Sequence, residues 1–419
     1  MKDNQAKYPQ LRFKGFTDPW EQRKLSDIAT LNARIGWQNL RTSEFLESGD
    51  YMLITGTNFH DGTVDYSTVH YVEKNRYEQD TKIQVENGSI LITKDGTLGK
   101  VALVQGLNMP ATLNAGVFNV KIKDPETIDV DYVYQYLAAP FLMKYANAKS
   151  TGGTIKHLNQ NILIDFPVLL PRKREQVKLA ELLNGLDNTI TLHQRKLAKL
   201  KELKQGYLQK LFPKNGSKFP QLRFAGFADA WEKRKLIDQL SLLKDGTHGT
   251  HKDGDFAFLL SAKNVIQNSI VFDDSDRKIS EDDFNDVYAN YHIKKNDVLL
   301  TIVGTIGRVA LFPRLTVPVA FQRSVAILRT KPTLFPYFLA LELQTPSIQS
   351  KIKARANMSA QAGIYLGDLK KIVIAIPKSE EQIEIAMFLN RLTNLIAATQ
   401  CKLDLLKKLK KGYLQKMFC

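Results

Sequence analysis

Hydrophobic residues recur every three or four positions in two long stretches of the chain. The first stripe consists of Leu183, Leu186, Ile190, Leu197 and Leu200. The second stripe consists of Leu389, Leu392, Ile396, Leu403 and Leu406. His193 and Thr399 hold the same polar position within the two stripes, where we expect a polar layer rather than a functional pair. Alternating steps of three and four are the heptad spacing of coiled coils, so the pattern predicts two long helices.

Each predicted helix follows a proline that ends an apolar, β-like run, at Pro171 and at Pro377. A strand that leaves a globular domain and continues as a helix fits this order. The 36-residue stripe region would span roughly 54 Å as a helix. The two stripes would most simply pack on each other as an antiparallel pair. The alternative is that each stripe packs on its own globular domain.

The segments that precede the helices read as strands and turns. In ILITKDGTLGKVALV, β-branched runs flank Asp95-Gly96, which predicts a hairpin. A later segment keeps the turn with Gly304 and Gly307. Short helices are expected near residues 133–148 and 336–352. Each of these middle regions is therefore predicted to be a mixed α/β domain.

Three segments of the chain occur twice, in the same order. Residues 8–25 return as residues 219–236 with 13 of 18 positions identical, and we call these the PQLRF segments. The hairpin region returns at residues 297–312, and residues 171–212 return as 377–418 with 22 of 42 positions identical. Units of about 200 residues are too long for solenoid repeats, so the chain contains one duplicated module.

The duplication predicts an α+β fold with pseudo-twofold symmetry. Two mixed α/β domains are joined by two long antiparallel coiled-coil helices. The expected boundaries are 1–170 and 215–376 for the globular domains, and 171–214 and 377–419 for the helices. The ends of the module are close copies, whereas the middles have diverged. This pattern fits neutral drift of surface loops, or ends that bind one kind of partner and middles that bind different things.

Composition narrows the class of protein. A hydrophobic content of 43% with 24% charged residues is that of a globular chain. No apolar run reaches the roughly 18 residues of a membrane helix, and the first residues lack a signal core, so a cytoplasmic protein is expected. Two cysteines, Cys401 and Cys419, exclude a disulfide framework and a Cys-rich zinc site.

The net charge of +16 indicates a polyanionic partner, but its distribution is uneven. The two helical segments, 171–214 and 377–419, carry +11 of it, and residues 1–170 carry −1. A phosphate backbone or an acidic protein surface fits this excess, although charges that flank an apolar stripe can also be a solvated face.

Common catalytic motifs are missing, which argues against an enzyme. There is no phosphate-binding loop, adenine-methyltransferase motif, nucleophile elbow or zinc-protease pair of histidines. His248 and His251 lack nearby cysteine or carboxylate ligands, so a turn or polar contact loop is expected there and no metal site.

Polar, Gly-rich loops in the middles are the candidate DNA-binding elements, because their side chains are of the kinds that read base edges and grip phosphates. Trp37 in one of them could stack on a base or be buried. In the first half the candidates are Arg34, Trp37, Gln38, Asn39, Arg41, Lys94, Lys149, Thr151, Thr154, Lys156 and His157. In the second half they are Lys244, Thr247, His248, Thr250, His251, Lys252, Lys263, Asn264, Arg323, Arg355, Ser359 and Gln361.

The duplicated plan resembles the specificity subunit of type I restriction–modification systems. The resemblance covers essentially the whole chain. It rests on both PQLRF segments, the DGTHGTHKDGDFAFLLSAKNV run, the MSAQAGIYLGDLKKIVIAIP run and the P-x-x-x-E-Q helix starts at Glu175 and Glu381.

The resemblance implies two target-recognition domains, each reading one half of a bipartite, asymmetric site in double-stranded DNA, with the helices setting the spacer. It further implies two methylation subunits that use S-adenosylmethionine to methylate an adenine in each half-site, and restriction subunits that use ATP and Mg. The chain itself would bind no cofactor and carry no catalysis. Two alternatives stay open, a stand-alone DNA-binding regulator and a coiled-coil scaffold.

Overall fold

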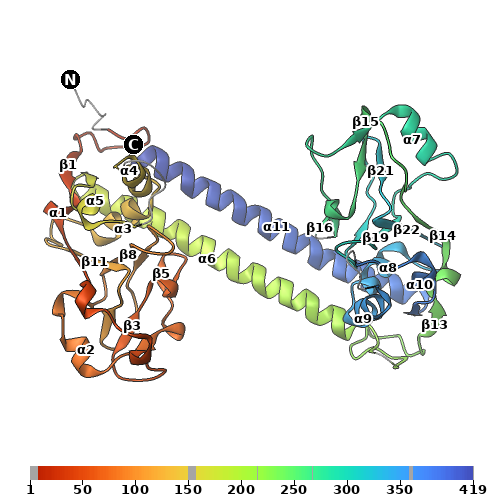
Figure 1. Ribbon diagram of the computed structural model, residues 1–419, viewed down its shortest axis with the longest axis horizontal. Coiled ribbons are helices and arrows are strands. Elements are labelled where there is room, and N and C mark those ends of the chain that lie inside the picture. The colour runs from red at the N-terminus through yellow and green to blue at the C-terminus, as the bar shows by residue number, and fades with distance from the viewer. Residues whose placement is uncertain (1–7, 150–156, 215, 267, 358–361, 419) are drawn as a thin grey trace. The chain divides into compact units, whose positions relative to one another are not determined.

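The computed structural model describes residues 8–149, 157–214, 216–266, 268–357 and 362–418 (Figure 1). The chain divides into two compact units, one of residues 1–195 with 400–419 and one of residues 196–399. Both long helices pass from one unit to the other. Each unit therefore combines one middle region with the beginning of one long helix and the end of the other.

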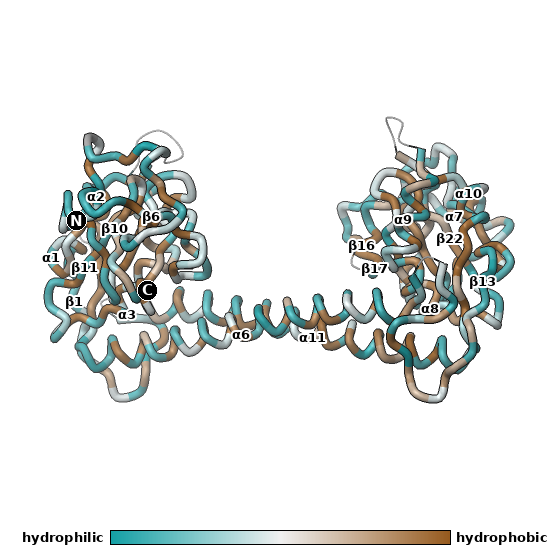
Figure 2. The backbone as a smooth tube through the Cα atoms, turned by 90° about the horizontal axis from the view of Figure 1, so that it is seen from below, coloured by the Kyte–Doolittle hydropathy of each residue, from teal (hydrophilic) through white to brown (hydrophobic). Residues whose placement is uncertain are grey.

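The two predicted long helices are present as α6 (Lys173–Lys210) and α11 (Ser379–Met417). Each follows a short strand, β12 (Pro167–Leu170) or β23 (Val373–Ile376), which confirms the strand-then-helix order. None of the ten stripe residues is exposed. Figure 2 shows hydrophobic and hydrophilic stretches alternating along both helices, as the heptad spacing requires.

The helices pair in antiparallel fashion within each unit. In the first unit, Lys410 of α11 donates to Asp187 of α6 at 2.6 Å, and Phe418 lies in the same core as Leu183. In the second unit the rings of Tyr207 and Phe388 are 4.8 Å apart. The beginning of each stripe also packs into its own globular core, so both packing modes considered from the sequence occur.

The first unit contains a six-stranded sheet of order β2-β11-β8-β9-β5-β4, a four-stranded sheet of order β6-β3-β10-β7 and the pair β1-β12. The remaining strands of this unit are β1 Glu21–Lys24, β2 Ala29–Ala33, β3 Met52–Ile54, β4 Phe59–His60, β5 Thr63–Val64, β6 His70–Tyr71, β7 Gln84–Val85, β8 Ile90–Thr93, β9 Val101–Leu103, β10 Ala111–Leu113 and β11 Val117–Ile122. Its short helices are α1 Leu25–Ile28, α2 Lys74–Glu78, α3 Val130–Ala138, α4 Phe141–Lys149 and α5 Gln160–Ile164.

The second unit repeats this plan, but its two main sheets contain fewer strands. The strand orders are β14-β22-β19-β20 and β18-β15-β21, with the pairs β13-β23 and β16-β17. Its other strands are β13 Glu232–Lys235, β14 Leu240–Asp245, β15 Asp253–Leu260, β16 Val265–Ile266, β17 Ser269–Ile270, β18 Lys278–Ile279, β19 Val298–Thr301, β20 Val309–Leu311, β21 Val319–Phe321 and β22 Val325–Thr330. Its helices are α7 Glu281–Val287, α8 Pro336–Leu343, α9 Pro346–Arg355 and α10 Leu366–Lys370.

The central strands β8 and β19 are apolar up to their final threonine because both of their faces are buried. In β8, Ile90 and Ile92 face the core that contains α3 and α6, whereas Leu91 faces a second core with β3 and β10. In β19 the same alternation separates Leu299 from its neighbours. A continuous apolar run is the expected pattern for a strand packed on both sides.

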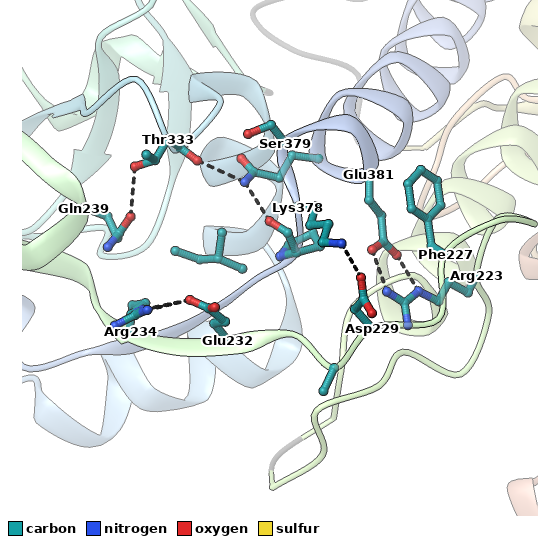
Figure 3. Close-up of a pocket in the computed structure, with 14 residues that line it drawn as sticks. Arg223, Phe227, Asp229, Glu232, Arg234, Gln239, Thr333, Lys378, Ser379 and Glu381 are labelled. Carbon is teal, nitrogen blue, oxygen red and sulfur yellow. Dashed lines mark hydrogen bonds and ion pairs between the residues drawn. The ribbon is translucent and has the colours of Figure 1, made fainter.

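Each PQLRF segment is tied to the start of a long helix by a buried ion pair. Arg12 forms two hydrogen bonds of 2.7 Å with Glu175, and Arg223 forms the same pair of 2.7 Å bonds with Glu381. Both carboxylates are 1% exposed. Figure 3 shows the second pair at the edge of a 400 Å³ pocket that includes Lys378 and Asp229.

The glutamine of each P-x-x-x-E-Q motif caps a neighbouring helix of the globular domain. Gln176 accepts a hydrogen bond of 2.8 Å from the amide of Asp129, which precedes α3. Gln382 accepts an equivalent 2.8 Å bond from the amide of Phe335, which precedes α8. The motif thus orients the long helix against both the PQLRF segment and the globular core.

Loss of Arg223 is expected to destabilise the second unit. Replacing Arg223 with Ala leaves the Glu381 carboxylate buried without its partner, which costs about 3–5 kcal/mol. Hydrogen–deuterium exchange should show faster exchange in β13 and β23. In the double variant Arg223→Met/Glu381→Leu the loss should be much smaller. Equal exchange in the single and double variants would show that the unpaired Glu381 carboxylate is not the cause of the loss.

Candidate nucleic-acid interface

Strand register brings three loops of the first unit to one end of its six-stranded sheet. Ala33, the last residue of β2, pairs with Phe118, and Thr93, the last residue of β8, pairs with Val117. The chain therefore leaves β2, leaves β8 and enters β11 at the same edge. We call this place the first loop end; it comprises these three loops, residues 34–41, 94–100 and 114–116, together with residues 157–158, which hydrogen bonds join to them.

Backbone hydrogen bonds join these loops. The Lys94 amide donates to the Gly116 carbonyl at 2.8 Å, and the Leu158 amide donates to the Lys94 carbonyl at 2.9 Å. His157 Nδ1 lies 2.6 Å from Asp95 Oδ1. A segment that follows α4 in the sequence is in this way held against the β8–β9 hairpin.

The second unit builds an equivalent second loop end from residues 246–252, 302–308, 322–324 and 362–364. Asp245 at the end of β14 pairs with Ala326, and Thr301 at the end of β19 pairs with Val325. The Ile302 amide donates to the Ser324 carbonyl, and the Ile364 amide donates to the Ile302 carbonyl. These two bonds repeat, at the equivalent positions, the pair found in the first loop end.

Several predicted contact residues of the first half are accessible. Asn39, Arg41, Lys149 and His157 are exposed, and Lys94 is half-buried. The Lys94 ammonium lies 5.7 Å from the centre of the Phe118 ring. Lys149, at the end of α4, lies 5.6 Å from the Tyr145 ring. These five side chains place amide, imidazole and cationic hydrogen-bonding groups at the surface.

The second loop end presents a different set of side chains. His248, Thr250, Lys252 and Arg323 are exposed there, and the predicted contacts Lys263 and Arg355, which lie outside the second loop end, are exposed as well. Thr247 Oγ1 and His251 Nε2 form a hydrogen bond of 2.7 Å, and His248 Nε2 lies 2.6 Å from Asp245 Oδ2. The two histidines thus have separate partners in the loop and do not converge on one point.

Two predicted contact residues of the second unit, Lys244 and Lys263, have partners within the protein. Lys244 Nζ lies 4.2 Å above the ring of Tyr291, and burial raises the pKa of that phenol to about 12. Lys263 Nζ lies 2.7 Å from Asp276, and hydrogen bonds from Lys263 and Asn264 lower the pKa of Asp276 to about 2. Lys263 therefore stands beside a carboxylate that offsets its charge.

Three predicted contact residues are buried, which corrects the expectation that they face DNA. Arg34 is 2% exposed; its guanidinium donates to the carbonyls of Leu113 and Gln38, and burial lowers its pKa. Gln38 is 5% exposed. Asn264 is 3% exposed and bonds to Asp276 and to backbone groups. Arg34 and Asn264 support the loops from within through these hydrogen bonds, whereas the Gln38 side-chain oxygen is buried without a hydrogen-bond partner among the described residues.

Five further predicted contacts, Thr151, Thr154, Lys156, Ser359 and Gln361, lie outside the described residues, as does the side chain of Trp37. The structure also adds residues that the sequence did not single out. The turn at 114–116 belongs to the first loop end, Gln322 and Ser324 flank the predicted Arg323 in the second, and each loop end contains one further cation, Lys100 or Arg308. Only strand register reveals the turn and the two flanking residues, whereas the repeat alone could have pointed to the two cations.

The chemistry available at the loop ends is hydrogen bonding and positive charge. Among the described residues, no group of three or more histidine, cysteine or carboxylate side chains is placed to hold a metal ion. In the same part of the chain, no helix has the length and apolarity to cross a membrane. The chain thus has two similar backbone frameworks that carry different polar side chains.

Comparison with known families identifies the class. The model of the type I restriction modification DNA specificity domain matches the chain twice, over residues 17–202 and 242–408. These matches cover most of the sequence, and the chain belongs to this family. The double match follows the internal duplication.

Similar proteins include the inferred MjaX type I restriction enzyme specificity subunit of Methanocaldococcus jannaschii, 24% identical over 94% of this chain and 91% of that one. The EcoBI specificity subunit of Escherichia coli is 26% identical over 66% of this chain and 61% of that one. The crystal structure of the type I restriction–modification S subunit from M. genitalium shares the fold, with a TM-score of 0.62 at 15% identity over 98% of this chain and 99% of that one.

Proposed function

We propose that the chain is the DNA-specificity subunit of a type I restriction–modification complex. In this function each loop end reads one half of a bipartite, asymmetric DNA site, and α6 and α11 set the spacer between the halves. The observation that carries the proposal is the pair of loop ends, which share a backbone framework and differ in their exposed side chains. Family membership supports the same function.

The proposal assigns recognition to this chain and chemistry to its partners. Two methylation subunits would dock on the duplicated ends of the module, because a repeated surface suits two copies of one partner. They would carry S-adenosylmethionine and reach an adenine that is flipped out of each half-site. Restriction subunits would join the complex with ATP and Mg. Exposed Arg, Lys, Asn and His side chains at the loop ends suit contacts to phosphates and base edges.

Genome-wide mapping of methylated adenines in cells with and without the gene tests this function. Deletion should abolish methylation at one bipartite, asymmetric sequence, and a plasmid copy should restore it. An unchanged methylation map would contradict the proposal. A DNA-binding assay over a range of salt concentrations distinguishes this function from that of a stand-alone regulator. Such a regulator would bind one sequence tightly without methylation subunits.

A further inference from the structure

The β8–β9 hairpin and its counterpart β19–β20 are the best-preserved part of the diverged middles. The two loops read Thr-Lys-Asp-Gly-Thr-Leu-Gly-Lys (93–100) and Thr-Ile-Val-Gly-Thr-Ile-Gly-Arg (301–308), and Val-Ala-Leu follows both. Both lie at the loop ends described above. Similarity concentrated at this point, while the neighbouring loops differ, requires a common cause.

Part of that cause is the architecture of the loop. The Thr93 hydroxyl donates to the Thr97 carbonyl and accepts from the Lys100 amide, and the Gly99 amide donates to the Thr93 carbonyl. Thr301 forms the same bonds, to the Thr305 carbonyl and from the Arg308 amide. The two threonines are thus explained by folding.

Folding also explains why glycine stands at positions 99 and 307, just before the end of each loop. Gly99 and Gly307 have φ angles of +70° and +91°, which L side chains rarely adopt. A Cβ at Gly99 would lie 2.1 Å from Met143, and one at Gly307 would lie 2.3 Å from Gln349. Met143 and Gln349 belong to α4 and α9, so each hairpin packs closely against a helix of its own unit.

Folding does not explain the cation that ends each loop. Lys100 and Arg308 are both exposed. The backbone amide, which any residue except proline provides, makes the bond to the threonine. The only protein acceptor recorded for the Arg308 side chain within the described residues is the Val265 carbonyl, at a long 3.4 Å. A positive charge at this position is therefore available for a ligand.

The surroundings of the cation differ between the units. Beside Arg308 lies an open hollow of 480 Å³ that also includes Asn268, Gln344 and Gln349. In the first unit, Met143 takes the place that Gln349 has against the hairpin. A shared cation among different neighbours suits a ligand group that is the same at both loop ends. In duplex DNA that group is the phosphate, because the bases vary and the backbone does not.

We propose that Lys100 and Arg308 each contact a backbone phosphate of the DNA and fix the register of their half-site, while the diverged loops around them read the bases. This inference rests on the proposed function. Both cations are positioning residues: their contacts strengthen binding to any sequence, and they set no base preference.

The test uses the full chain in complex with its methylation subunits. Binding to the methylated target and to a scrambled duplex is measured by fluorescence anisotropy across a salt series. Lys100→Ala and Arg308→Ala should each weaken both complexes by a similar factor and reduce the salt slope by about 1, and the double variant by about 2. The methylated sequence should stay unchanged.

Matched variants separate the role of charge from damage to the loop. Lys100→Arg and Arg308→Lys should retain the salt slope, and Lys74→Ala, at an exposed lysine of α2, should behave as the original protein. An unchanged slope in Lys100→Ala and Arg308→Ala, or a change of one methylated half-site, would overturn the inference. Absence of salt-dependent binding by the unaltered complex would instead contradict the proposed function.

Discussion

Exchange of residues 25–166 for the corresponding segment of a relative with another target is expected to change one half of the methylated DNA sequence and leave the other half intact. The first loop end lies wholly within this segment, and the second lies wholly outside it. Single-molecule sequencing of methylated DNA measures both halves of the site in one experiment.

The structure defines where such an exchange should begin and end. The segment lies between β1 and β12, which pair with each other and remain with the recipient chain. The donor must supply the contacts that the segment makes with α6, among them Gln135, which donates to Asn184 and Asp187 at 2.8 Å. A donor with glutamine at that position preserves the join.

Exchange of the corresponding segment of the second unit, residues 236–372, is the matched control. It replaces the second loop end and should change only the other half of the target. The modular interpretation fails if either exchange alters both halves, or if a folded and methylating hybrid keeps the original target. A hybrid that forms no complex is distinguished by gel filtration with the methylation subunits.

Insertion of one heptad into both long helices is expected to lengthen the unspecific spacer by about three base pairs. Seven residues add about 10.5 Å of helix, and one base pair takes up 3.4 Å of the DNA axis. A heptad keeps the stripe on the same face, so the helices can still pair. Insertion after Arg195 and after Thr399 falls where the two compact units divide and leaves the core of each unit intact.

The spacer is read from the same methylation map. Seven residues inserted between Ser48 and Gly49, in an exposed loop of the first unit, should leave it unchanged. An unaltered spacer in the double helix insertion, with methylation retained, would show that the helices do not determine the separation of the half-sites.

Elements with a strong period or a strong turn signal could be predicted from the sequence. The heptad stripes predict α6 and α11, and the glycines after apolar runs predict the hairpins closed at Gly99 and Gly307. The W-E-x-R-K-L part of each PQLRF segment gave no structural prediction. Trp20 and Trp231 prove to be 2% and 1% exposed core residues, and β1 and β13 follow them. A single tryptophan carries no period that would reveal its burial.

The loops of the candidate site were predictable as loops, but the direction of their side chains was not. Arg34 and Gln38 stand in the same polar segment as Arg41, and only the tertiary structure separates the buried pair from the exposed residue. Arg34 is buried because the carbonyl of Leu113, 79 residues away, lies within 2.9 Å. No local pattern encodes such a contact.

The sequence by itself determined the duplicated plan and the two long helices, since repeats and heptads can be read without coordinates. Only the tertiary structure decided which loops meet at each loop end, because that depends on the register of strands far apart in the chain. It also decided which of their side chains are exposed, because burial depends on the hydrogen bonds and packing between those loops. The net charge pointed to the helices, whereas strand register brings the candidate DNA-binding loops together at the ends of the sheets.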